Sequence, residues 1–103
     1  MTLKTVNNLG ILYADQGKLA EAEQILEWGL RGYEKALGIE HTSTLDTVSN
    51  FGSLYQNQGK LAEAEQVLER ALRGYEKALG TDNTTTYIPA LNTMWVLGSL
   101  FER

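Results

Sequence analysis

The chain has 103 residues, of which 43% are hydrophobic and 21% charged, the composition of one small soluble domain. Its net charge is −4 and its basic residues are scattered, which argues against nucleic-acid or anionic-membrane binding, because both need a basic surface. The absence of cysteine excludes disulfides, thiolate catalysis and zinc–thiolate sites, and without a membrane-spanning apolar run or a leader-like start we expect a cytoplasmic protein.

A first helix is predicted ahead of Gly17. Small and apolar residues recur there at intervals of three and four, the spacing of one helical face, at Val6, Leu9, Gly10 and Tyr13. Glycine accepts the left-handed backbone that ends a helix, so Gly17 marks a turn. The small residue at Gly10 is expected to let the next helix approach closely.

A second, longer helix is predicted from about Lys18 to Leu37, with Gly38 as its stop. Glu21 and Glu23 lie in its first turns, where the helix dipole favours anions. Its inward stripe has helical spacing and comprises Leu19, Ala22, Leu26, Gly29, Leu30, Tyr33 and Leu37.

The third helix is expected to be capped by Thr44 with the neighbouring Ser43, and Asp46 is expected in its first turn. The last helix is predicted to begin near Ile88, because Pro89 is tolerated only near a helix start.

The third and fourth helices are expected to repeat the first two. QGKLAEAEQ occupies Gln16 to Gln24 and returns at Gln58 to Gln66. Pairing Leu3–Gly38 with Leu45–Gly80, at an offset of 42, gives 27 identities in 36 positions. We interpret the repeated stretch as scaffold that makes the same turn and starts the same helix twice.

A third unit is incomplete. LGSLF at Leu97–Phe101 matches FGSLY at Phe51–Tyr55, at an offset of 46, and no further QGK follows. The predicted organisation is a single array with repeat 1 at 1–38, repeat 2 at 39–80 and the first helix of repeat 3 at 81–103. This is an all-α solenoid of about five antiparallel helices.

The residue order within a unit resembles a tetratricopeptide repeat: Leu9-Gly10, Tyr13, Gly17, Ala22 and Leu26, then Gly29 or Ala71. The period of 42 exceeds the usual value of about 34 by roughly two helical turns. With TLDTVSNFGSLYQNQGKLAEAE and RALRGYEKALG, the chain is similar to the kinesin light chain subtype, and similar arrays end some fungal nucleotide-binding receptors. The resemblance implies a right-handed solenoid that binds proteins on a concave wall of first helices.

The sequence contains no assembled catalytic or metal-binding group. His41 is the single histidine and has no cysteine or second histidine at metal-binding spacing, so a turn or capping role is favoured. Glu21 and Glu23 are two positions apart, which puts them on different faces of a helix rather than in an acid–base pair. We therefore expect no enzyme activity, no cofactor and no metal.

The two full units differ mainly on one face of their first helices. Six of the nine differences fall there, and apart from the core exchange of Leu9 for Phe51 they step by three and four residues. Such drift is typical of a ligand-selecting surface, and also of any solvent-exposed face. In the resembled family this face is the concave wall. Its predicted members are Lys4, Asn7, Ile11, Ala14 and Asp15, then Asp46, Ser49, Ser53, Gln56 and Asn57, then Asn92, Trp95, Ser99, Glu102 and Arg103.

Asn8 and Asn50 hold the same place in units one and two. In similar family members such asparagines clamp the backbone of an extended peptide, since an amide both donates and accepts. A hydrogen bond to a neighbouring helix is the alternative, and Val96 takes this place in the third unit. The predicted wall carries about one net negative charge, so we expect a neutral or mildly basic peptide.

The last helix supports a second hypothesis, self-association. It lacks a paired second helix, and arrays of this kind usually need about three repeats and polar end caps. Either the chain is a fragment of a longer array, or it completes itself by pairing or swapping with a second copy, which would give a homodimer. The expected partners are a peptide or protein, or a second copy, and not nucleic acid or a membrane. The apolar residues concerned are Met94, Trp95, Val96, Leu97, Leu100 and Phe101.

Overall fold

The computed structural model describes residues 2–80 and 87–101, with the backbone alone for Phe101. The described residues form five helices in chain order: α1 (Leu3–Asp15), α2 (Leu19–Leu37), α3 (Thr42–Asn57), α4 (Leu61–Leu79) and α6 (Ile88–Phe101). They contain no strand. The predicted all-α helical repeat is therefore confirmed, as is a last helix that begins at Ile88.

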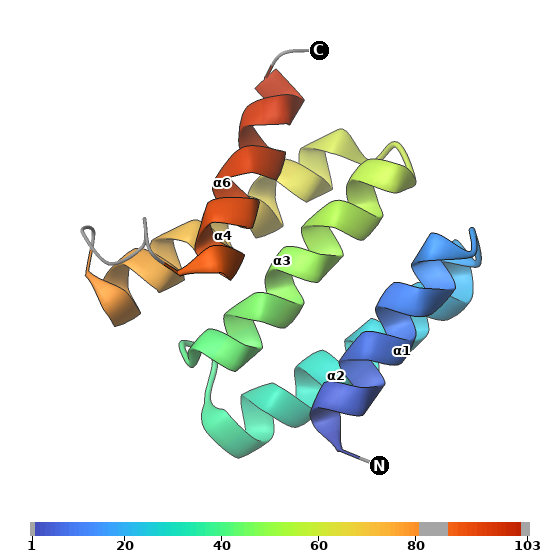
Figure 1. Ribbon diagram of the computed structural model, residues 1–103, viewed down its shortest axis with the longest axis horizontal. Helices are drawn as coiled ribbons and strands as arrows, with labels where there is room; N and C mark the ends of the chain where they lie inside the picture. The colour runs from blue at the N-terminus through green and yellow to red at the C-terminus, as the bar shows by residue number, and fades with distance from the viewer. Residues whose placement is uncertain (1, 81–86, 102–103) are drawn as a thin grey trace.

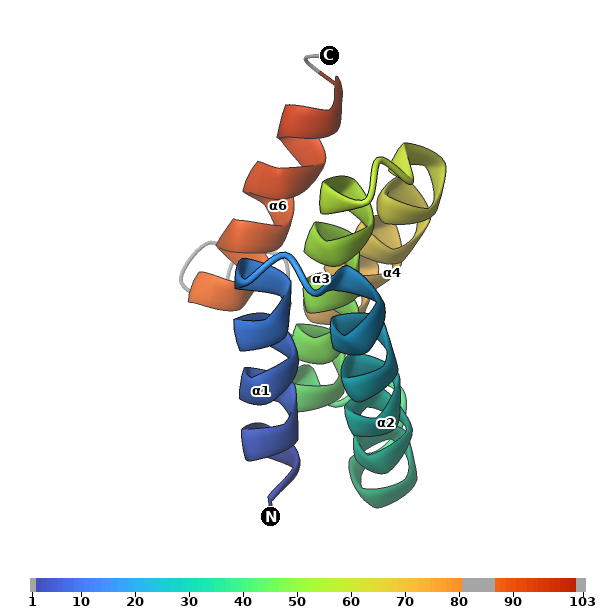
Figure 2. The same cartoon turned by 90° about the vertical axis from the view of Figure 1, so that its right-hand side faces the viewer.

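The helices form two layers (Figure 1). The first helices α1, α3 and α6 make one layer, and the second helices α2 and α4 make the other. Figure 2 shows α1 and α6 on the left and α2 and α4 on the right. Helix α3 packs against both α2 and α4, so it joins the two units. None of the helices within the described ranges is both long and apolar enough to cross a membrane.

The repeated QGK stretch makes the same turn twice. Gly17 and Gly59 have φ angles of 80° and 78°, in the left-handed region that glycine adopts without strain. In each turn the lysine N–H donates to a tyrosine carbonyl five residues earlier, at 2.9 Å for Lys18 and 2.8 Å for Lys60. The structure thus confirms that this stretch makes the same turn and starts the same helix in both units.

Glycine also sets how closely the paired helices approach. A Cβ on Gly10 would lie 2.7 Å from Leu26 Cδ2, and a Cβ on Gly52 would overlap the side chain of Leu68. Leu26 and Leu68 are 1% and 0% exposed, so each leucine side chain fills the space that the glycine leaves open. The close approach predicted at Gly10 is confirmed, and it recurs in the second unit.

The core lies between the two layers in two buried clusters. One joins α3, α4 and α6, and the other joins α2 and α3. The inward stripe predicted for α2 is buried or half-buried except at its end, where Leu37 is 45% exposed. The clusters contain Leu45, Val48, Ala71, Tyr75 and Ala90, and Ala22, Leu26, Phe51 and Leu54.

Helix α3 begins two residues before the predicted cap. His41 is the N-cap residue, and its Nδ1 accepts a hydrogen bond from the Ser43 N–H at 3.0 Å. The capping role considered for His41 is confirmed, whereas the cap assigned to Thr44 and Ser43 is wrong. Thr44 is fully buried and donates its hydroxyl to the Gly38 carbonyl at 2.8 Å. The first turn contains no acidic residue, so the expected place of Asp46 is also wrong.

Candidate functional site

A hollow of 160 Å³ lies between α1 and α3, on the layer of first helices. Leu26 and Leu54 are buried core residues that also line it, while Asn57 and Asp15 are exposed. Ile11 is 37% exposed and adds an apolar contact. The structure therefore brings much of the predicted wall together in one place. The predicted members that line the hollow are Ile11, Ala14, Asp15, Asn50, Ser53 and Asn57.

The asparagines that precede the Leu-Gly or Phe-Gly pair have different surroundings. Asn50 Nδ2 donates to Asn7 Oδ1 at 3.1 Å, which links α3 to α1 and is the neighbouring-helix bond weighed as the alternative. This bond uses one of two amide hydrogens, so Asn50 keeps a donor hydrogen and its oxygen for a ligand. Asn8 is exposed on α1, away from this bond.

Hydrogen bonds also join α3 to α6. The hydroxyls of Ser49 and Thr93 are 2.6 Å apart, and Gln56 Nε2 donates to Ser99 Oγ at 3.3 Å. These contacts engage Ser49, Gln56 and Ser99 within the fold, so three predicted wall residues help to hold the first helices side by side.

Asp46 lies at the junction of α3, α4 and the start of α6 rather than in the hollow. Its carboxylate accepts the hydroxyl of Tyr75 at 2.6 Å and the hydroxyl of Tyr87 at 3.1 Å. Burial raises the pKa of Asp46 above 3.8, its ordinary value, and the two tyrosine hydrogen bonds oppose this rise by favouring the charged form. Burial and the neighbouring carboxylate raise the pKa of Tyr75 as well.

Because burial outweighs the hydrogen bonds, the Asp46 carboxyl is expected to titrate above 3.8 in an NMR pH titration. Tyr75→Phe removes one stabilising hydrogen bond from the carboxylate, so it should raise the pKa of Asp46 further. A folded-state pKa above the unfolded value stabilises the fold fully below pH 3.8, and this contribution is lost as pH rises through the folded-state pKa. A measured Asp46 pKa at or below 3.8, or a pKa lowered by Tyr75→Phe, would contradict this balance.

Three further predicted wall residues, Lys4, Asn92 and Trp95, do not line the hollow. Lys4 and Asn92 are exposed on α1 and α6. Trp95 is 80% exposed, more than any other large hydrophobic side chain in the described part of the chain. Glu102 and Arg103 lie outside the described residues.

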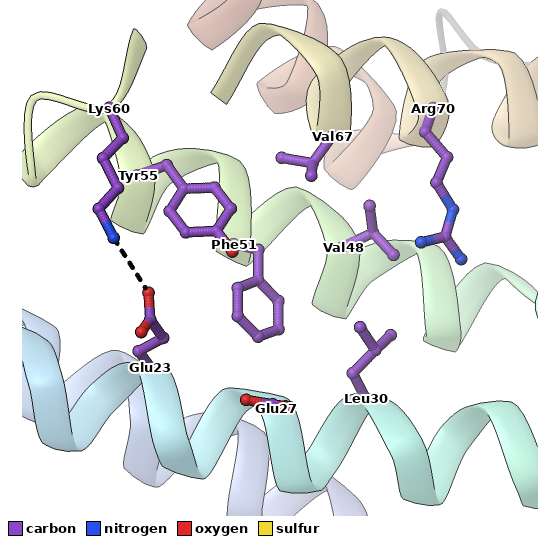
Figure 3. Close-up of a pocket in the computed structure, with 9 residues that line it drawn as sticks. All are labelled: Glu23, Glu27, Leu30, Val48, Phe51, Tyr55, Lys60, Val67 and Arg70. Carbon is purple, nitrogen blue, oxygen red and sulfur yellow. Dashed lines mark ion pairs between the residues drawn. The ribbon is translucent and has the colours of Figure 1, made fainter. Parts of the chain in front are cut away.

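A wider hollow of 420 Å³ lies on the other layer, between α2 and α4, and the sequence did not reveal it. Figure 3 shows Phe51 reaching from α3 toward α2, with Leu30 on α2 and Val67 on α4 beside it. Leu30 was assigned to a core stripe, and the periodicity of one helix cannot show how far α2 and α4 stand apart. Only the positions of three helices together create this space.

Ion pairs between the two units rim this wider hollow. Lys60 Nζ lies 3.7 Å from Glu23 Oε1 (Figure 3), and Arg70 Nη2 lies 3.4 Å from Glu34 Oε2. Burial, then the nearby carboxylates led by Glu23, raise the pKa of Tyr55. The rim charges are thus largely paired with each other. Among the described residues, no group of three or more His, Cys, Asp or Glu side chains is arranged to hold a metal ion.

A family model described as "Tetratricopeptide repeat" matches residues 1–77, three quarters of the chain. A comparison with the curated proteins finds no match.

Proposed function

Because the chain belongs to the tetratricopeptide repeat family, whose repeats generally serve as protein–protein interaction modules, we propose that it binds an extended peptide or protein segment on its first helices. The family is generally non-catalytic, and we propose the same for this chain. The binding surface is the layer of α1, α3 and α6, centred on the hollow between α1 and α3. We also propose the repeat boundaries 1–38, 39–80 and 81–103.

The observation that carries this proposal is that variable positions from two units meet in one hollow. Ile11, Ala14 and Asp15 differ from their counterparts Ser53, Gln56 and Asn57, and five of these six line the same 160 Å³ space. The packing residues of the two units are nearly identical, so this surface varies while the fold around it stays the same. A surface free to vary beside a fixed scaffold suits ligand selection.

The chemistry of the hollow indicates the kind of segment that fits. Asn50, Ser53 and Asn57 supply neutral donors and acceptors, which suit a peptide backbone of any sequence. Asp15 adds one negative charge, and the carboxylate of Asp46 is engaged by two tyrosines elsewhere. These groups favour a neutral or mildly basic segment over an acidic one.

We place the chain with the kinesin light chain-like subtype on its period of 42 residues. Helices α2 and α4 have 19 residues each, longer than α1 and α3, which have 13 and 16. The self-association alternative depends on α6, on which Leu91 is 39% and Trp95 80% exposed.

The proposal predicts that Ser53→Arg weakens peptide binding at least about tenfold, because a long charged side chain fills the hollow and repels basic segments. The peptides would be selected from a displayed random library against the whole chain, and their Kd measured by fluorescence anisotropy. Gln66→Arg is the matched control, since it adds the same side chain at an exposed position of α4. Equal Kd values for the two folded variants and the unmodified chain would rule out the α1–α3 hollow as the binding surface.

A further inference from the structure

The wider hollow between the second helices, the α2–α4 hollow, has an apolar end and a charged end. Figure 3 shows Leu30, Val48 and Val67 at one end, and Glu23 and Lys60 at the other. Leu30 and Val67 pack against the buried cluster that contains Val48. The apolar end is therefore a firm surface on which a hydrophobic side chain of a ligand can be removed from water.

Two of the three differences between the second helices lie in this hollow. Val67 of α4 replaces Ile25 of α2 at the offset of 42, and it is smaller by one methylene group. Arg70 replaces Trp28 and reaches Glu34 across the rim. The lining thus changes between the units while the packing residues beneath it stay the same, which suits a surface that selects a ligand.

The charged end carries more carboxylates than cations. Burial is the main reason that the pKa of Tyr55 is raised, and the charges of three nearby glutamates raise it further. Of the two cations that line the hollow, Lys60 lies at this end (Figure 3). The field at this end therefore favours a further cation. The three glutamates are Glu23, Glu27 and Glu63.

Two of these carboxylates are available to a ligand. Glu27 pairs with Arg31, which lies one turn further along α2, is 75% exposed and does not line the hollow. Exposed pairs of this spacing add little stability, so a cation of a ligand can take the place of Arg31. Glu63 has no ion-pair partner within the described ranges.

We propose that the α2–α4 hollow binds an extended segment of a partner protein in which a hydrophobic residue is followed two positions later by a lysine or arginine. The hydrophobic side chain lies on the apolar end, and the cation lies between Glu23 and Glu27. This hollow shares no lining residue with the α1–α3 hollow, so it does not depend on the function proposed there. The chain could then hold two segments at once, one on each layer.

The spacing of the lining residues decides the spacing in the partner. Glu27 and Glu23 lie three and seven positions before Leu30 on α2, which is about 5 and 10 Å along the helix axis. Alternate side chains of an extended segment point to the same side and are about 7 Å apart. A cation two positions from the hydrophobic residue therefore reaches the space between the two carboxylates.

An acidic segment fits this hollow less well. Lys60 and Arg70 each already face a glutamate of α2, at 3.7 Å from Glu23 and 3.4 Å from Glu34. An anion would have to compete with these glutamates for the cations and would enter the field of the remaining carboxylates.

The test uses the whole chain and a set of tripeptide probes: acetyl-Phe-Gly-Lys-amide and the same peptide with glutamine or glutamate as its last residue. Each probe is titrated into methyl-labelled protein while the NMR signals of the Leu30, Val48 and Val67 methyl groups are followed. We expect saturable shifts with the lysine probe and a Kd at least about threefold lower than for the glutamate probe, with the glutamine probe between them. Equal Kd values for the lysine and glutamate probes, or shifts that do not saturate, would overturn the proposal.

Lys60→Gln gives opposite results for a cationic and an anionic ligand. It frees Glu23, so the lysine probe should bind at least about twofold more tightly, whereas an anionic ligand would lose a partner and bind more weakly. Lys18→Gln is the matched control, because Lys18 lies over Tyr13 as Lys60 lies over Tyr55 and does not line the hollow. A lysine probe that binds Lys60→Gln more weakly than Lys18→Gln contradicts a cationic ligand.

Two further variants test each end of the hollow. Glu27→Gln should raise the Kd of the lysine probe at least about twofold, and Glu69→Gln should leave it unchanged. Glu69 is the counterpart of Glu27 on α4 and pairs in the same way with Arg73, and both glutamates are partly exposed, so both variants are expected to fold. Val67→Phe fills the apolar end and should abolish the saturable shifts while circular dichroism shows unchanged helical content. Equal Kd values for the two glutamine variants, or unchanged binding by a folded Val67→Phe variant, would rule out this site.

Discussion

Leu68→Ala is expected to lower the free energy of unfolding by about 2–5 kcal/mol. Leu68 is 0% exposed, and its side chain fills the space above Gly52 at the contact between α3 and α4. Truncation removes buried methyl groups and leaves a cavity that the rigid helix pair cannot close. A small domain usually has a stability of about 5–15 kcal/mol, so this loss is a large fraction of the total. Urea denaturation followed by circular dichroism should therefore show a clearly lower urea concentration at the unfolding midpoint.

Leu61→Ala provides the control, because Leu61 lies on the same helix and is 38% exposed. Its loss of unfolding free energy should be less than half that of Leu68→Ala, since little of its surface is removed from water. Equal losses of unfolding free energy at the two positions would show that the α3–α4 contact does not depend on the Leu68 side chain that packs against Gly52.

Gly52→Ala is expected to destabilise the fold by about 1–3 kcal/mol, although alanine favours a helix by about 1 kcal/mol. The added Cβ overlaps the Cγ and Cδ2 atoms of Leu68, a fully buried side chain, so the leucine or the two helices must shift. The measurement is again the unfolding free energy in urea.

Gly98→Ala is the matched control for this glycine, because it makes the same change at the corresponding place on α6. There the Cβ meets nothing, so the gain in helix propensity should raise stability slightly. Combining Gly52→Ala with Leu68→Ala should cost less than the two separate losses together, since the overlap disappears. Additive losses in this double-mutant cycle would contradict the overlap between Gly52 and Leu68.

The repeat allowed much of the fold to be predicted. The turns at Gly17 and Gly59, the close approach at Gly10 and the start of α6 at Ile88 all follow from local pattern. A turn or capping role was favoured for His41, but the cap of α3 was assigned to Thr44 and Ser43, although the imidazole of His41 accepts the same kind of bond. Local preference could not decide between them, because both residue types lie within two positions of the helix start.

The candidate site was predictable only as a list of residues. Helical spacing placed Ile11 and Ser53 on one face, and the structure brings both to one hollow. Spacing could not show that Asp46 is held by Tyr75 and Tyr87, because these contacts span 29 and 41 residues. Nor could spacing show that Ser49 faces Thr93 across two helices.

The sequence by itself determined the helices, their turns and the fact that the same helix pair occurs twice, because these depend on spacing and backbone preference within one unit. Only the tertiary structure decided which polar side chains form hydrogen bonds or ion pairs within the fold and which remain available to a partner. Contacts between units, such as Glu23 with Lys60 and Asn7 with Asn50, depend on the distance and rotation between neighbouring helix pairs. That geometry is set by packing across the whole array, and it leaves Gly98 open at the edge of α6.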